Sequence, residues 1–122
     1  MSKYKTYKES YKHKSAKKVL ADWLKGEYRV FVEPYMGIDS MTFRPDVVAY
    51  SGENLSAIYE VVNKNSIDGK KLGKIQYYGY LHGINFLCHE VSADWILNQT
   101  EKPDKIEFLW TYDITDEPVP FD

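Results

Sequence analysis

Residues 44–62 have the sequence RPDVVAYSGENLSAIYEVV, and this stretch decides the expected fold. We expect strands over residues 43–50 and 56–63, because both segments are rich in β-branched and aromatic residues. The residues Ser51-Gly52-Glu53-Asn54 between them supply a turn. The second strand is almost continuously apolar from Ala57 to Val62, which is typical of a central strand buried on both faces.

Further elements surround this hairpin on both sides. Apolar residues at helical spacing predict helices over residues 10–24 and 68–83, and Gly26 is the expected stop of the first. Strands are expected over residues 28–33, 85–91 and 105–112, with a short helix or turn over 93–99. The order α-β-β-β-α-β, then β, predicts an α/β (α+β) fold whose mixed central sheet is flanked by helices.

The chain length of 122 residues fits one domain with one core. We expect residues 1–112 to form this domain, beginning with a basic helix. Residues 113–122 hold two prolines and four acids and are expected to form a loose acidic tail.

The composition is that of an ordinary globular protein, 43% hydrophobic and 28% charged. No apolar run approaches the roughly 20 residues needed to span a bilayer, and the N-terminus does not resemble a signal peptide. We therefore expect an intracellular, cytoplasmic protein with no membrane role. The single cysteine, Cys88, cannot form an internal disulfide and is expected to pack in the core.

The net charge of −2 conceals an uneven distribution, since residues 1–25 carry eight lysines against Glu9 and Asp22. Two interpretations are open: a basic arm that contacts DNA phosphates, or a solvated helix face. In the first, the phosphate contacts fall to four lysines of the first helix, Lys12, Lys14, Lys17 and Lys18.

Asp46 and Glu60 are the candidate metal-binding carboxylates. They lie 14 positions apart on the two expected strands, so a hairpin brings them side by side, and clustered carboxylates can hold a divalent cation. In the alternative, Asp46 ends a turn after Pro45 and Glu60 points to solvent. Glu60 interrupts an apolar run, however, and a buried ionised carboxylate is costly unless it is paired or metal-bound.

These residues resemble a known family. Arg44-Pro45-Asp46-Val47-Val48 and Ile58-Tyr59-Glu60-Val61-Val62 are similar to the signature of the PD-(D/E)xK (restriction-endonuclease-like) nuclease superfamily, as is the αβββαβ order. Gln76-Tyr77-Tyr78-Gly79-Tyr80 resembles the QxxxY motif of its RecB-like branch, and together the likeness covers about residues 10–92.

The resemblance implies a DNA nuclease that uses Mg²⁺ or Mn²⁺. Asp46, Glu60 and the Val61 carbonyl would bind the metal, and Gln76 and Tyr80, on one helical face, would point at the site or at DNA. Glu33 would be an additional upstream acid, or else a surface residue that ends its strand. A homodimer would fit this activity, as in small nucleases that cut both strands.

The sequence departs from the family at the lysine, because Val62 occupies the position two residues after Glu60. Strand alternation would carry Lys64 to the face of Glu60, and Lys71 or Lys74 could substitute from the second helix. Each of the three could also be a surface lysine. Two other functions therefore stay open: a catalytically inactive protein of this fold that binds DNA or a protein partner, and an interaction domain with no nucleic-acid role.

Overall fold

The computed structural model describes residues 10–117 of the chain. The elements in chain order are α1 (Tyr11–Leu24), β1 (Arg29–Val32), a short 3₁₀ turn (Asp39–Met41), β2 (Val47–Ser51), β3 (Asn54–Val62), α2 (Gly69–His82), β4 (Phe86–Ser92), α3 (Ala93–Leu97) and β5 (Trp110–Ile114). The expected α+β class, with a mixed sheet flanked by helices, is confirmed.

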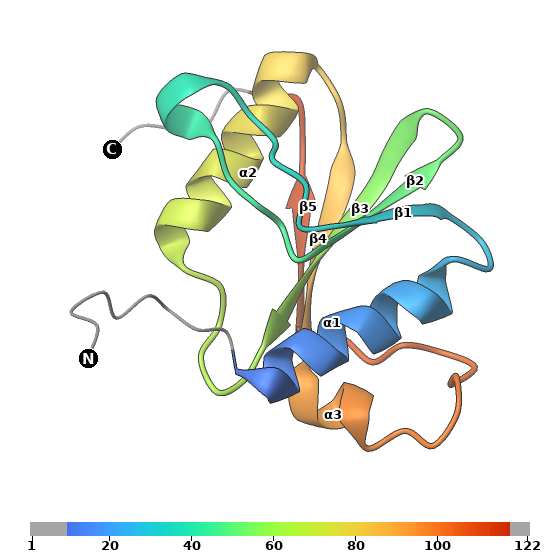
Figure 1. Cartoon of the computed structure of the whole chain (residues 1–122). Helices are drawn as coiled ribbons and strands as arrows, with labels where there is room; N and C mark the ends of the chain where they lie inside the picture. Colours follow the sequence, from blue (N-terminus) through green and yellow to red (C-terminus); the bar gives the residue numbers. More distant parts are fainter. Residues whose placement is uncertain (1–9, 118–122) are drawn as a thin grey trace.

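The sheet has the strand order β1-β2-β3-β4-β5, so sequence neighbours are also spatial neighbours. β1–β2, β2–β3 and β4–β5 are antiparallel, whereas β3 and β4 run parallel. A parallel pair requires a crossover connection, and α2 supplies it (Figure 1). β3 is thus the central strand that its apolar run predicts.

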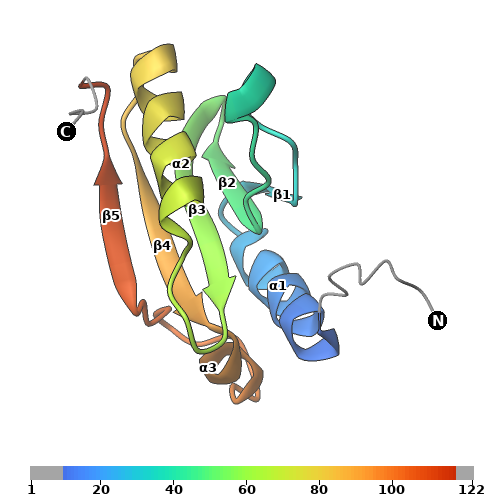
Figure 2. The same ribbon diagram turned by 90° about the vertical axis from the view of Figure 1, so that its left-hand side faces the viewer.

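Helices cover both faces of the sheet, as Figures 1 and 2 show. α1 and α3 pack on one face around Leu20, Val61 and Ile96. α2 packs on the other face around Ile58, Ile75 and other apolar side chains. Because strand side chains alternate between faces, even-numbered residues of β3 point toward α2 and odd-numbered ones toward α1.

The two long helices begin and end at residues suited to those positions. The Ser10 side chain accepts a hydrogen bond from the His13 amide (3.1 Å), and the Asp68 side chain accepts one from the Lys70 amide (3.0 Å). Gly83 ends α2 in the left-handed region at a φ of 63°, where glycine carries no steric penalty.

Two strands begin four or more residues later than the sequence predicts. β2 begins at Val47 rather than residue 43, because Pro45 has no amide hydrogen to donate and Phe43 bridges Met36 instead. β5 begins at Trp110 rather than residue 105, because Ile106 and Phe108 pack on the α1 side of the sheet without joining a strand ladder.

The expected start of the acidic tail at residue 113 is also wrong, because β5 extends past it. β5 continues to Ile114, which is 1% exposed and pairs with Phe86. Residues 113 and 114 therefore belong to the sheet, and residues 118–122 lie outside the described part of the chain. Within residues 10–117, no helix is both long and apolar enough to cross a bilayer.

Candidate active site

Asp46 and Glu60 meet where β2 begins and β3 ends. The pairing of Val47 with Tyr59 sets them side by side, and both are buried, with 8% and 4% exposed. The Asp46 amide donates to Glu60 Oε2 (3.0 Å), and the Val61 amide donates to Asp46 Oδ2 (2.8 Å). Each carboxylate is thus fixed by the backbone of the other strand, and the structure brings together the two predicted acids.

Lys71 supplies a cation to Glu60, with its Nζ 2.6 Å from Glu60 Oε1. It lies in the first turn of α2, at four- and eight-residue spacing from Ile75 and Gly79, which are both buried. Residues at this spacing share one helix face. The face of α2 that packs on the sheet therefore also delivers the lysine.

Lys17 and His13 reach the acids from α1. Lys17 is 3% exposed, and its Nζ lies 3.0 Å from Glu33 Oε1 and 3.5 Å from Asp46 Oδ1. His13 Nε2 is 2.6 Å from the Val61 carbonyl oxygen and 3.6 Å from Asp46 Oδ2. Because a carbonyl oxygen only accepts, Nε2 carries the proton.

Glu33 joins the site from the end of β1. Its amide donates to the Asp46 carbonyl (3.0 Å), and its carboxylate lies between Lys17 and Arg44, whose Nη2 is 3.2 Å from Glu33 Oε2. Glu33 has a φ of 53°, which is uncommon for a residue with a side chain. Such strained backbone is frequent at functional sites.

The surroundings of Asp46 and Glu60 shift the pKa values of the two carboxyl groups in opposite directions. Burial and the neighbouring Asp46 charge raise the pKa of Glu60 to about 7, although Lys71 opposes them. Burial would also raise the pKa of Asp46, but the His13 hydrogen bond, Lys71, the Val61 amide and Lys17 outweigh it and lower the pKa. The hydrogen bond with Asp46 raises the pKa of His13 against the effect of burial. The pair therefore keeps Asp46 ionised, while Glu60 binds or releases a proton near neutral pH.

The donor types fit a divalent ion. Carboxylate oxygens of Asp46 and Glu60 and the Val61 carbonyl oxygen are ligands that Mg²⁺ and Mn²⁺ accept. Within residues 10–117, however, no three His, Cys, Asp or Glu side chains are grouped so that they could hold an ion as they stand. Ammonium groups of Lys17 and Lys71 lie against the carboxylates instead.

The structure places the other predicted site residues away from the two acids. β3 ends at Val62, so strand alternation does not continue to Lys64, which is exposed. Lys74 donates to the Thr42 carbonyl (3.1 Å). Gln76 is half-buried farther along α2 and makes no hydrogen bond to either acid in the described part of the chain, and Tyr80 is 44% exposed.

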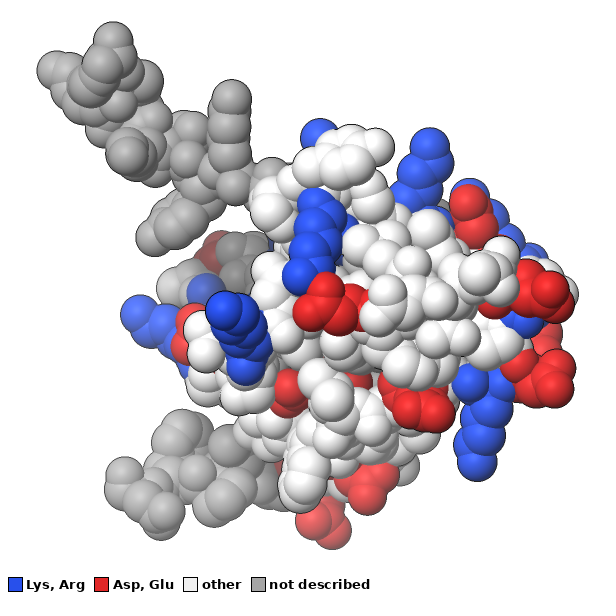
Figure 3. All heavy atoms as spheres, turned by 90° about the horizontal axis from the view of Figure 1, so that it is seen from below, with Lys and Arg blue, Asp and Glu red and all other residues white. Residues whose placement is uncertain are grey.

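The lysines of α1 do not form one exposed row. The expectation that Lys17 contacts DNA phosphates is wrong, because Lys17 is buried beside Glu33 and Asp46. Lys12 pairs with Asp94 of α3 at 2.5 Å, whereas Lys14 and Lys18 are exposed. Figure 3 shows the molecule from below, and its described basic and acidic side chains are interspersed rather than gathered into one basic patch.

Sequence reasoning missed the roles of His13 and Lys17. A usable signal was present, since Lys17 lies beside Ala16 and three residues before Leu20, within the apolar stripe of the helix. A cation in a buried stripe predicts a buried anionic partner.

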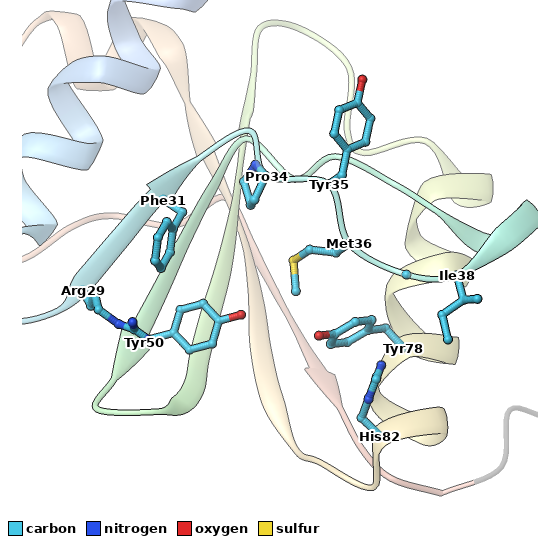
Figure 4. A pocket seen from close by; sticks show the side chains of 10 residues that line it. Arg29, Phe31, Pro34, Tyr35, Met36, Ile38, Tyr50, Tyr78 and His82 are labelled. Carbon is cyan, nitrogen blue, oxygen red and sulfur yellow. The ribbon is translucent and has the colours of Figure 1, made fainter.

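A separate hollow of about 470 Å³ lies toward the other end of α2 (Figure 4). Tyr50, Tyr78 and His82 line it, and the Arg29 guanidinium lies 5.4 Å from the Phe31 and Tyr50 ring centroids. No acid lines this hollow, so it lacks the carboxylates that the site at Asp46 and Glu60 offers.

The start of α1, the end of β3 and the loop before α2 lie together at the lower end of the molecule in Figure 1. Comparison with known proteins finds a family match over the segment that runs from the start of α1 to Glu60 in β3. The family described as competence protein CoiA, nuclease-like domain, matches residues 9–60, which include His13, Lys17, Glu33, Asp46 and Glu60. No curated protein matches the chain. The family match supports a nuclease-like family for this chain.

Proposed function

We propose that this chain is a Mg²⁺- or Mn²⁺-dependent DNA nuclease of the PD-(D/E)xK type. The observation that carries the proposal is the buried Asp46–Glu60 pair with the Lys71 ammonium 2.6 Å from Glu60. Two adjacent carboxylates and one lysine are the charged groups that metal-assisted phosphodiester hydrolysis needs. The nuclease-like family match over residues 9–60 supports the same reaction class.

Asp46, Glu60 and the Val61 carbonyl would hold the ion. The ion, when bound, polarises the phosphate and lowers the pKa of a water molecule. Asp46 is ready for this role because its lowered pKa keeps it ionised. Glu60 must release a proton near pH 7 to become a full ligand.

Lys71 takes the role of the family's lysine in this proposal. Val62, at the usual position, is 9% exposed and packed, whereas Lys71 reaches Glu60 from α2. The ammonium would stabilise the negative charge that builds on the phosphate in the transition state. Lys17 and His13 are positioning residues, because they hold Asp46 and the Val61 carbonyl from α1.

The RecB-like assignment is a finer part of the proposal. Gln76 and Tyr80 lie four residues apart on α2, the helix that carries Lys71, and they share one helix face. We propose that this face contacts the DNA backbone farther along α2, away from the two acids.

Cleavage by matched variants tests the function. Wild-type protein should cut DNA when Mn²⁺ or Mg²⁺ is added and stop when a chelator removes the ion. Glu60→Gln should abolish cutting, since it removes a metal ligand charge. Glu53→Gln, an exposed acid in the turn at the other end of the same hairpin, should cut like the wild type.

Three results would contradict the proposal, and the third favours a different function. One is a wild-type protein that cuts DNA with neither ion. Another is equal cutting by wild type and Glu60→Gln, which would trace the activity to a contaminant. The third is a folded protein that binds DNA without cutting it, which would support the inactive alternative that the packed Val62 favours.

A further inference from the structure

A second hollow, of about 380 Å³, adjoins the site on the α2 side of the sheet. Val62, Lys64, Glu90, Trp110 and Tyr112 are among the residues that line it. Its volume is at the lower end of the range that holds small organic ligands. The hollow is therefore large enough to admit one nucleobase.

The strand register connects this hollow to the Asp46–Glu60 pair. Glu60 of β3 is paired with Glu90 of β4, and Glu90 is paired with Trp110 of β5. Paired residues on adjacent strands point to the same sheet face. Glu60, Glu90 and Trp110 thus form a row across that face, which runs from the candidate metal ligand into the hollow.

The tryptophan of the hollow is accessible to solvent, whereas Tyr112 is half-buried. Trp110 is 60% exposed, and its ring centroid lies 6.3 Å from that of Tyr112. Leu109 beside it is 57% exposed. An accessible tryptophan face is a stacking surface for an unpaired base, whereas the bases of a duplex already stack on one another.

The charges indicate which part of a nucleotide would enter. Glu90 lines the hollow, is 3% exposed, and accepts a hydrogen bond from the Tyr112 hydroxyl (2.6 Å). A carboxylate at this place repels a phosphate but accepts hydrogen bonds from the amino group of a base. Lys64 lines the same hollow and is exposed, so it can contact the phosphate outside.

We propose that this hollow holds one unpaired base of single-stranded DNA, stacked on Trp110, next to the phosphate at the Asp46–Glu60 site. DNA as the ligand rests on the proposed nuclease function. The hollow adds the form of the substrate: a single strand, or a duplex end with an unpaired base.

Binding measured in a chelator tests the proposal without cleavage. The full-length protein is titrated into a labelled single-stranded oligonucleotide and into a hairpin duplex of the same length, and anisotropy reports the affinity. Trp110→Leu should weaken single-strand binding about tenfold, within the range for one lost base–aromatic stack, and change duplex binding much less. Trp110→Phe should restore most of the affinity because it keeps an aromatic face.

A double-mutant cycle links the tryptophan to a base. Abasic nucleotides are introduced one position at a time, and one of them should weaken wild-type binding but have no further effect on Trp110→Leu. Phe31→Leu, which alters an exposed aromatic side chain at the other hollow, should behave like wild type.

Three results would overturn the proposal: unchanged single-strand affinity in Trp110→Leu, an equal loss on the duplex, or abasic and Trp110 effects that simply add. A change in self-association on Trp110→Leu, without a change in DNA affinity, would assign the surface to a second copy of the chain. The proposed nuclease function is tested separately, by cleavage. Cleavage without Trp110 dependence removes only this inference, and Trp110-dependent binding without cleavage removes only the nuclease.

Discussion

At the scale of single residues, the site is a set of buried charges that each have an opposite charge or a backbone amide beside them. Lys17 lies between Glu33 and Asp46, and Lys71 lies against Glu60. Removing one member of a buried pair leaves the other uncompensated, which costs more than the pair itself contributes. These residues are therefore coupled, and a substitution at one changes the proton affinity of the others.

The lysine that serves the reaction should be Lys71 rather than Lys64. Lys71→Ala should lower turnover by about 10²-fold or more at saturating DNA, because it removes a charge beside the reacting phosphate. Lys64→Ala should keep turnover close to wild type, since Lys64 is exposed beyond the end of β3. Single-turnover cleavage measures the difference, and circular dichroism checks that both variants fold.

The opposite ranking would reassign the role. A large loss in Lys64→Ala together with full turnover in Lys71→Ala would show that the ion pair with Glu60 is structural. Lys74→Ala is the matched control on α2, because Lys74 bonds the Thr42 carbonyl and not an acid of the site.

At the scale of elements, the helices were predicted well and two strand boundaries were not. Helix ends depend on local chemistry such as the Ser10 and Asp68 caps and Gly83, and all of it is visible in the sequence. Strand boundaries depend on a partner strand that is distant in sequence. Residues 105–109 alternate like a strand, but their apolar side chains pack on the sheet without a ladder, so the pattern alone misplaced β5.

The glycines of α2 give a prediction at this scale. Of Gly73 and Gly79, only Gly79 lies in close contact with another element, since a Cβ there would lie 2.7 Å from Ile114 Cγ2. Gly79→Ala should therefore destabilise the fold although alanine favours helix. A Cβ at Gly73 would meet nothing within 4 Å. Gly73→Ala should therefore stabilise the fold by up to about 1 kcal/mol.

Urea unfolding of the two variants measures these opposite signs. Equal stabilisation by both would mean that α2 moves away from β5 at no cost. In that case the close contact at Gly79 would not fix the position of the helix, or of the Lys71 that it carries.

At the scale of the whole molecule, the site is assembled from α1, the end of β1, the β2–β3 hairpin and α2. The hairpin part could be predicted, because Asp46 and Glu60 are joined by a short turn whose geometry sets their pairing. The part from α1 was missed: the place of Lys17 in the apolar stripe of the helix signals its burial, but its partners Glu33 and Asp46 lie on other elements that the helix pattern does not identify. Lys71 was one of three lysines that the sequence left open, and the packing of Ile75 and Gly79 against the sheet singles it out.

The stability of the whole fold should record the Glu60 proton. Its pKa rises from an ordinary 4.5 to about 7 in the folded chain, so the folded state binds the proton more tightly than the unfolded state does. This contribution is fully present below pH 4.5 and is lost as pH rises to about 7, and by pH 8 the loss amounts to roughly 3 kcal/mol. His13, whose pKa is also raised, loses its own contribution as pH rises above 6.5, whereas Asp46, whose pKa is lowered, loses its contribution only in acid.

Glu60→Gln isolates this contribution, because the amide keeps the shape of the protonated acid and cannot ionise. The variant should lose much of the decline in unfolding free energy that the wild type shows between pH 5 and 8, while Glu53→Gln should keep the wild-type profile.

Mn²⁺ should reverse the decline in the wild type, since the ion replaces the proton between Asp46 and Glu60 and stabilises the folded state according to its affinity. The Mn²⁺-induced rise in Tm should therefore be larger at pH 8 than at pH 5 and absent in Glu60→Gln. A Tm rise of equal size in Glu60→Gln would place the ion elsewhere on the molecule, and the carboxylate pair would then be a structural feature of the hairpin.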